Sequence, residues 1–360
     1  MRFKAKLALE QVQLLCNLIG PISRLSGSAS SSSDGAGGLL LGSSTMGIGG
    51  GGTVIYLDPE RMRISARGGT GGGGGSDGDG IACFSELTTR GGIFLEHRIE
   101  SAAKDVILFE IDLAQLRLAL QSVLAGGGGR GRKRSSPQAL HNSSAADGGT
   151  DEFVGSLAAP SVIVMKLAKR NGGLPCLCLD ASCAGGSVEV HHAIPVRIMR
   201  ADEMQYHLPP RISMPDVQLE LPPDRPLKTV AERLRTISPH VFIEGSMAGE
   251  LTLRIDGDGA SIRTFYNKLV PRFEDLKSAP EGEQDENDFP ARCTLKVDSK
   301  KLNACLHWQG TMVLGRSVEK AVLCMVENEM LVLHCMLNPG EIGFFTYYVP
   351  VHFLSPDQID

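Results

Sequence analysis

The feature that most constrains the fold is a pair of similar segments in distant parts of the chain. One runs from Val106 to Leu124 and the other from Ala291 to Gln309. In each, apolar residues alternate up to an Asp, and leucines follow four and eight positions after it. Alternation predicts a strand with one buried face, and the later spacing predicts a helix. The two aspartates, Asp112 and Asp298, then lie at helix N-caps, where a carboxylate accepts the free N–H groups of the first turn.

Other features repeat in the same order. Pro195 and Pro350 each lie in an Ile/Val-Pro-Val triplet that closes a strand-rich stretch, where a ladder N–H is not needed. Residues 3–8 and 217–221 alternate, and each leads into a helical apolar pattern. These patterns comprise Val12, Leu15, Ile19 and Ile22, and then Leu227, Val230, Ala231 and Leu234. We therefore predict a duplicated α+β domain, with two helices laid on one side of an antiparallel sheet in each half.

Most of the 43 glycines lie in three segments, residues 26–52, 68–80 and 126–149. These Gly/Ser-rich segments have little to bury, so we predict disordered insertions that are dispensable for folding. The acidic run from Glu281 to Asp288 belongs to a fourth insertion. The predicted organisation is a first domain over 1–198, a connector over 199–215, a second domain over 216–350 with the acidic insertion at 271–290, and a tail over 351–360.

Charge and hydropathy limit the environment of the protein. A net charge of −5 argues against coating nucleic acid over the whole surface, but it permits one basic face. The N-terminus lacks the apolar region of a signal peptide, and no apolar run reaches the roughly 18 residues that a membrane span needs. Several of the nine cysteines lie in strand-like runs, which is typical of reduced core thiols. We expect an intracellular protein without membrane contact.

The candidates for enzymatic chemistry are weak. Residues 47–52 match a GxGxxG pattern, but they precede a strand, whereas a dinucleotide site needs a strand, then glycines, then a helix. A second candidate is a group of possible metal ligands: Cys176, Cys178, Cys183, His191 and His192. Its CxC spacing differs from the CxxC spacing of ordinary zinc sites. We expect no catalytic residue, metal or cofactor, and zinc analysis would test the alternative of an enzyme built around Cys176, Cys178 and His191.

The sequence also carries a long family pattern. It includes the opening MRFKAKL, the run AIPVRIMRADEMQYHLPPRISMPDV from Ala193 to Val217, and the following QLELPPDRPLKTVAERLRTISPHVFIEGSMAGELTLRI. In these runs the chain resembles the Hus-one type subunit of the heterotrimeric checkpoint clamp, a PCNA relative. The resemblance is strongest over 191–270 and weakest over 26–80. A homotrimeric replication clamp of the PCNA type would share the fold, but residues 191–270 resemble the checkpoint subunit better.

The resemblance implies a non-catalytic subunit with two PCNA-like domains. Three different subunits would encircle DNA at damage sites, with helices lining the hole, and would serve as a platform for signalling and repair. The implied partners are two paralogous clamp subunits, a clamp loader, double-stranded DNA, and repair and checkpoint proteins. Residues 199–215 would be the interdomain connector, where clamps offer a groove to partner peptides. The implied location is the nucleus, with the cytoplasm as a second compartment.

Positive charge is concentrated on the helices that the resemblance places around the hole. The candidate DNA-binding residues are Arg24, Arg117, Arg225, Lys228, Arg233, Arg235, Lys300 and Lys301. The alternative is an ordinary solvated helix face. Because no aromatic residues are interleaved with these cations, we expect contacts to phosphates without sequence specificity.

Two further features bear on this interpretation. The basic run from Gly126 to Arg134 is a nuclear import signal, an accessory DNA contact or a plain solvated loop. Gly20-Pro21 falls inside the first expected helix, and we expect it to kink or end that helix.

Overall fold

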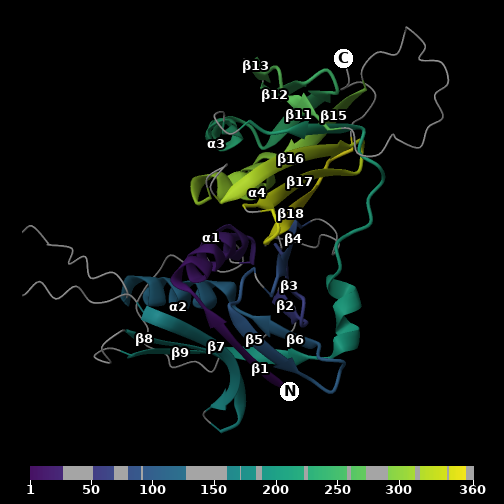
Figure 1. The fold of residues 1–360 in the computed structure, drawn as a ribbon. Coiled ribbons are helices and arrows are strands. Elements are labelled where there is room, and N and C mark those ends of the chain that lie inside the picture. The colour runs from purple at the N-terminus through teal and green to yellow at the C-terminus, as the bar shows by residue number, and fades with distance from the viewer. Residues whose placement is uncertain are drawn as a thin grey trace, which may run out of the picture.

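The structure is a computed structural model (Figure 1). It describes residues 1–26, 52–68, 80–90, 92–126, 160–170, 172–183, 189–222, 226–257, 261–272, 291–312, 317–338 and 340–353. The four predicted insertions and the basic run from Gly126 to Arg134 lie almost entirely outside the described residues, as does most of the tail after Val351.

The first half contains two helices and nine described strands. They are β1 (Arg2–Leu7), α1 (Leu9–Ser26), β2 (Thr53–Leu57), β3 (Arg61–Arg67), β4 (Ala82–Thr88), β5 (Glu96–Glu100), β6 (Ile107–Ile111), α2 (Leu113–Gly126), β7 (Pro160–Arg170), β8 (Leu174–Cys183) and β9 (Glu189–Met199). The two helices lie side by side and contact β3, β7, β8 and β9 (Figure 1). Two helices on one side of the strands is the predicted arrangement.

The second half repeats this plan. After the 3-10 helix η2 (Ala201–His207) come β10 (Val217–Glu220), α3 (Leu227–Ile237), β11 (His240–Ser246), β12 (Glu250–Asp256), β13 (Ser261–Tyr266), β14 (Val270–Pro271), β15 (Arg292–Asp298), α4 (Ser299–Cys305), the 3-10 helix η4 (Leu306–Gly310), β16 (Val318–Val326), β17 (Met330–Leu337) and β18 (Gly343–Pro350). Helix α3 contacts α4 and η4.

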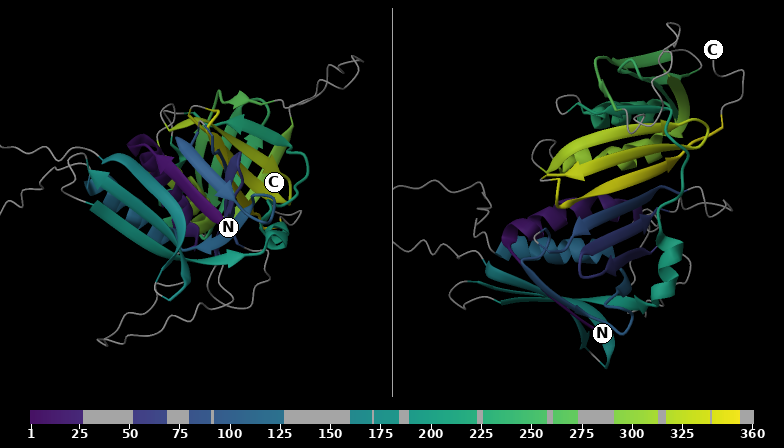
Figure 2. Two further views of the ribbon diagram at one scale, coloured as in Figure 1. Left: turned by 60° about the horizontal axis from the view of Figure 1, so that its bottom comes forward. Right: turned by 45° about the vertical axis from the view of Figure 1, so that its right-hand side comes forward.

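The described strands form two sheets, and every named pairing is antiparallel. One sheet of 14 strands spans both halves in the order β14-β10-β16-β17-β18-β4-β3-β2-β6-β9-β8-β7-β1-β5. The other has four strands in the order β13-β12-β11-β15. Figure 2 shows the strands of the second half continuing into those of the first.

The two similar segments found in the sequence have matching structures. β6 leads into α2 and pairs with β2, just as β15 leads into α4 and pairs with β11. Asp112 accepts the backbone N–H groups of Ala114 and Gln115 at 2.8 and 3.3 Å. Asp298 accepts those of Lys300 and Lys301 at 2.7 and 3.0 Å. Both predicted N-caps are confirmed.

The two prolines of the repeated triplets also occupy matching places. β9 pairs with β8 up to Pro195 and with β6 from Val196 onward, so Pro195 marks the point where the strand passes from one partner to the other. β18 ends at Pro350, and two residues later His352 forms a bridge with Lys296 of β15. The crossing strand of each half therefore has the same design.

Helix α1 differs from one expectation, because it continues through Pro21 to Ser26. The alternative in which Pro21 ends the helix is wrong. Apolar residues on both sides of the proline are fully buried, including Ile19, Ile22 and Leu25. Each buried aliphatic side chain stabilises the fold by about 1.5–3 kcal/mol, and together they outweigh the roughly 3 kcal/mol cost of an interior proline.

The core is largely aliphatic and runs through both halves as one cluster. Its few large aromatic residues include Phe109 in the first half and Trp308 and Tyr347 in the second. The eight cysteines whose side chains the structure describes are all free thiols, and burial raises the pKa of both the Cys293 and Cys305 thiols to about 12. These thiols are protonated core residues, as the sequence predicts. No helix in the described ranges is long and apolar enough to span a membrane.

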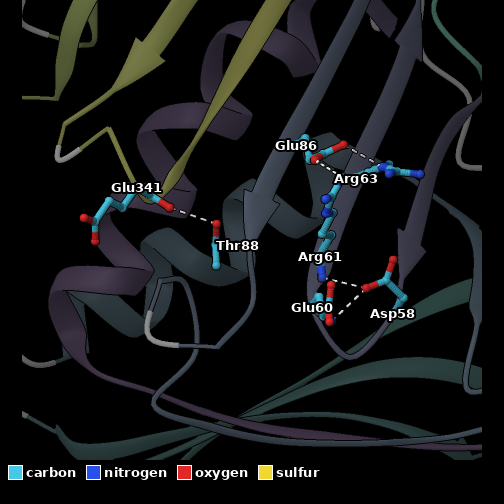
Figure 3. Close-up of polar contacts among 7 residues, drawn as sticks. All are labelled: Asp58, Glu60, Arg61, Arg63, Glu86, Thr88 and Glu341. Atoms are coloured by element: carbon cyan, nitrogen blue, oxygen red, sulfur yellow. Dashed lines mark hydrogen bonds and ion pairs between the residues drawn. The ribbon is translucent and has the colours of Figure 1, made fainter.

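The two halves join where β18 pairs with β4, from Gly343 opposite Leu87 to Tyr348 opposite Ala82. Figure 3 shows the end of this joint, where the Thr88 hydroxyl donates to the Glu341 carbonyl at 2.8 Å. The Thr88 N–H donates to the Ile342 carbonyl at 2.7 Å. A side chain at Gly343 would collide with the backbone of Glu86, so the close approach of the strands requires glycine.

The segment between the halves lies on the side of the molecule away from α1, α2 and α3 (Figure 1). It starts with η2 and continues without helix or strand to Pro215. The Arg67 guanidinium donates to the Tyr206 carbonyl at 3.1 Å, and the Ser213 N–H donates to the Glu329 carboxylate at 3.2 Å. This segment is therefore attached to β3 of the first half and to the turn between β16 and β17 of the second half.

Candidate nucleic-acid interface

The faces of α3 separate apolar from charged residues. Leu227, Ala231 and Leu234 are buried, as the helical spacing predicts. Lys228 and Arg235 are seven residues apart and therefore share a different face of the helix. The ammonium of Lys228 lies 3.6 Å from a carboxylate oxygen of Glu232, which also lies on that face. α3 therefore presents a mainly cationic surface beside its buried face.

The structure places most of the predicted DNA-binding residues on helices with accessible side chains. Arg24 is exposed in the last turn of α1, and Lys300 is exposed in the first turn of α4. Arg233 and Arg235 are exposed on α3. Arg117 on α2 and Lys228 on α3 are partly buried, and Arg225 lies outside the described residues.

Lys301 is an exception, because its residue surface is only 5% exposed. The prediction that Lys301 lines an open surface is therefore wrong. Lys301 and Cys305 are four residues apart in α4 and share one helical face, and Cys305 and Leu302 are both buried. The cap by Asp298 fixes where the helix starts and so how it is rotated about its axis. In this orientation Lys301 faces inward and Lys300 faces solvent.

Three of the predicted cations gather around a residue that the sequence analysis missed, His307 of η4. The Nη1 atom of Arg24 lies 3.5 Å from Nδ1 of His307. η4 contacts both α1 and α3, and the Lys228 side chain lies against Gly310 of η4. Arg117 lies beside Gly20 of α1. We call Arg24, Arg117, Lys228 and His307 the cation cluster.

The surroundings of His307 disfavour its protonated form. Burial has the largest effect and lowers the pKa of His307, and the charges of Arg24 and Lys228 lower it further. Glu232 opposes this shift, while Arg117 adds to it. Arg24 and His307 are far apart in the chain, so helical or strand spacing holds no signal for their contact.

The Cys/His group weighed as a metal site is spread over two strands. Cys176 and Cys178 are buried in β8. His191 is half exposed on β9, where its ring nitrogens lie 2.9 Å from Asp180 and 3.2 Å from Glu189. The hydrogen bond to Asp180 is the main cause that raises the pKa of His191. Across the described residues, no group of three or more His, Cys, Asp and Glu side chains is placed to hold a metal ion.

A cavity of about 270 Å³ lies between the connecting segment and the joint of the two halves. Its lining includes Tyr56, Arg63, Phe84, Leu208, Phe344 and Tyr348. The Arg63 guanidinium lies 5.3 Å from the centre of the Tyr56 ring. It also donates to Glu86 at 2.8 Å (Figure 3). Ser65 and Ser85 also line it, and their buried hydroxyls have no hydrogen-bond partner among the described residues. We call this cavity the connector groove.

Two similar α+β halves, joined edge to edge with their helices away from the connecting segment, define a protein with the fold of a DNA sliding clamp. A crystal structure of PCNA from Thermococcus kodakaraensis has the same fold, with a TM-score of 0.52 and 12% sequence identity. The match covers 97% of this chain and 100% of that chain. The predicted fold class is confirmed.

The chain belongs to the Hus1-like protein family, whose family model matches residues 46–352. It is 27% identical over 300 residues to a checkpoint protein hus1 homolog of Dictyostelium discoideum, covering 83% of this chain and 89% of that protein. It is 26% identical over 198 residues to the checkpoint protein HUS1 of Homo sapiens, covering 53% of this chain and 65% of the human protein. The family predicted from the sequence is confirmed.

Proposed function

We propose that this chain is the Hus1-type subunit of a heterotrimeric ring that encircles DNA at sites of damage and acts as a non-catalytic platform for checkpoint signalling and repair. Family membership and the clamp fold together make the chain a checkpoint clamp subunit rather than a homotrimeric replication clamp. The partners of the ring are then two other clamp subunits.

The observation that carries the proposal is the joint between β18 and β4. In the repeated plan, β9 of the first half corresponds to β18 of the second half. Likewise, β13 of the second half corresponds to β4 of the first half. Within the described residues, β13 pairs only with β12, and β9 before Pro195 pairs only with β8. Each half thus leaves open the strand edge that the internal joint uses, one at each end of the molecule.

These two open edges support a head-to-tail assembly. An edge strand with unpaired N–H and C=O groups is a template for another chain. Because β9 and β13 are different strands, the contact that a neighbouring subunit makes with one edge differs from the contact made at the other edge. Such heterologous contacts close into a ring when the rotation between subunits permits it. Two paralogous subunits, one at each edge, would complete a ring of three.

The exposed cations of the helices support contact with duplex DNA. The chain carries a net charge of −5, yet α3 carries Lys228, Arg233 and Arg235 against one acidic residue, Glu232. Duplex DNA presents one negative charge per roughly 1.7 Å of its axis. Contacts from these side chains to phosphates would hold the ring on DNA and let it slide, because phosphates carry no sequence information.

The connector groove supports the platform role. It is concave and partly apolar, and exposed Tyr206 and Leu208 lie on the neighbouring segment. A groove of this kind suits a short peptide of a partner protein, with aromatic and polar groups on its walls. We propose that repair and checkpoint proteins bind here, that a dedicated loader opens the ring, and that the complex works in the nucleus.

A salt titration of DNA binding tests the proposal. In the assembled trimer, the triple variant Arg233→Ala/Arg235→Ala/Lys300→Ala should weaken binding to every duplex sequence. The slope of log K against the logarithm of the salt concentration should become shallower by roughly one unit for each lost contact.

The matched control is Arg2→Ala/Lys4→Ala/Arg98→Ala. Arg2 and Lys4 alternate with buried residues of β1, and Arg98 lies opposite Lys4 on β5, so all three face away from the core. This variant removes the same charge from the outer face. If both variants bind DNA with the same affinity and salt slope while the trimer stays intact, the helices are not in the path of DNA.

A further inference from the structure

We propose that Arg24, Arg117, Lys228 and His307 form one phosphate-binding site for the DNA backbone that bridges the two halves of the chain, with His307 as a member that takes up a proton when DNA binds. The inference rests on the proposed function, because it assumes that DNA passes along the helices. It adds a histidine contact and a proton linkage to that function.

The four side chains reach one place from four different elements. Arg24 comes from the last turn of α1 and Arg117 from the middle of α2, both in the first half. Lys228 comes from the first turn of α3 and His307 from η4, both in the second half. The Lys228 backbone N–H also donates to Gln309 Oε1 at 2.9 Å, which ties α3 to η4. A ligand held by all four would contact both halves at once.

The contact with Arg24 defines which nitrogen of His307 carries the proton. A guanidinium only donates hydrogen bonds and stays charged, so Nδ1 of His307 must be the acceptor at 3.5 Å. The proton of the neutral ring is therefore on Nε2. No hydrogen bond of Nε2 is found within the described part of the chain. His307 thus offers a donor from Nε2 beside the donors of Arg24, and a phosphate oxygen accepts from both kinds.

The charges that face His307 come from three helices. They are Arg24 on α1, Arg117 on α2, and Lys228 and Glu232 on α3. Three cations stand against one carboxylate, and that carboxylate is about half exposed and 3.6 Å from Lys228. The cluster therefore keeps an excess of positive charge in a partly buried setting, where an anion is attracted more strongly than at an open surface.

Proton uptake follows from the same electrostatics. Without DNA, burial and the neighbouring cations lower the pKa of His307, so the ring is neutral near pH 7. A phosphate in the cluster favours the charged ring and raises that pKa. The proton is taken up at Nδ1, so the hydrogen bond from Arg24 is broken, and the freed Arg24 N–H donates to the phosphate instead. The added affinity is then fully present below the pKa of the free site and is lost as the pH rises through the pKa of the bound site.

The experiment measures duplex binding by the assembled trimer at several pH values between about 5.5 and 8, at constant ionic strength. Wild-type affinity should fall with rising pH, by about tenfold for each unit of pKa difference at His307 between the bound and free states. His307→Gln keeps a side-chain donor but cannot titrate in this range. Its affinity should match the wild type near pH 8 and lack this fall.

Two further variants separate the possible outcomes. Arg24→Ala should weaken binding and also reduce the pH dependence. His97→Gln, on β5 in the outer sheet, should leave the pH profile unchanged. A His307→Gln profile that follows the wild type overturns the phosphate site with His307. Failure of the trimer to bind DNA at any pH would instead overturn the proposed function.

Discussion

β4 and β13 occupy the same place in the two halves, but only one of them is covered. β4 pairs with β18, and its residues Cys83 and Ser85 are almost fully buried. In the described residues β13 has no strand on its outer side, and there Phe265 is 63% and Ile262 37% exposed. One edge belongs to the core of the molecule, and the other leaves apolar side chains in solvent.

The difference shows how one strand design serves two purposes in a duplicated chain. An uncovered strand edge with large apolar side chains is a liability for a monomer, since it invites pairing with other chains. In this protein the covered copy of the edge holds the two halves together. The open copy is then best explained by a partner subunit that covers it in the same way.

Replacing Phe265 with Glu should have the largest effect on this comparison. A charge on the open edge should prevent assembly with the neighbouring subunit, because a carboxylate buried without a partner is costly. The free energy of unfolding of the isolated chain should change by less than about 0.5 kcal/mol, because Phe265 is exposed. Size-exclusion chromatography with the two partner subunits, and thermal unfolding of the chain alone, measure the two effects.

Leu174→Glu is the control for this variant. Leu174 is 60% exposed at the start of β8, so the substitution adds the same charge to an apolar surface residue away from β13. It should assemble as the wild type does. Normal assembly by Phe265→Glu would show that β13 is not a subunit edge.

A smaller effect tests whether the helix N-caps stabilise the two halves to the same extent. Asp112→Ala and Asp298→Ala each remove a cap that accepts two N–H groups, and each should lower the free energy of unfolding by about 1 kcal/mol. The midpoint of thermal unfolding should then fall by roughly 2 °C. Asn at either position keeps the acceptor and should restore most of the loss. A loss at only one of the two positions would mean that the repeated caps do not stabilise the halves alike.

Local patterns in the sequence were sufficient to predict the repeated frame. The alternation before Asp112 and Asp298, the leucines after them and the buried residues of α3 all depend on neighbours within a few positions. Such spacing determines which face of an element is apolar whatever the element packs against. The same reasoning over-applied the helix-breaking effect of Pro21, because it did not weigh the buried residues on both sides.

Features that depend on distant contacts could not be predicted in this way. The burial of Lys301 depends on the rotation of a short helix, and the position of His307 depends on α1 packing beside η4. The outer faces of the two halves give a third example. A guanidinium lies over an aromatic ring in each half, Arg63 over Tyr56 and Arg254 over Phe242, but only in the second half does a lysine, Lys296, also lie near the ring, at 5.7 Å. Side chains decide this difference within one shared frame.

The most direct test of the account is the mass of the native assembly by native mass spectrometry. The purified chain is measured alone, and then after mixing with the two paralogous clamp subunits. The account predicts no ring from the chain alone, and a closed complex with one copy of each subunit after mixing. A homotrimer formed by the chain alone, with no uptake of the other two subunits, would contradict it.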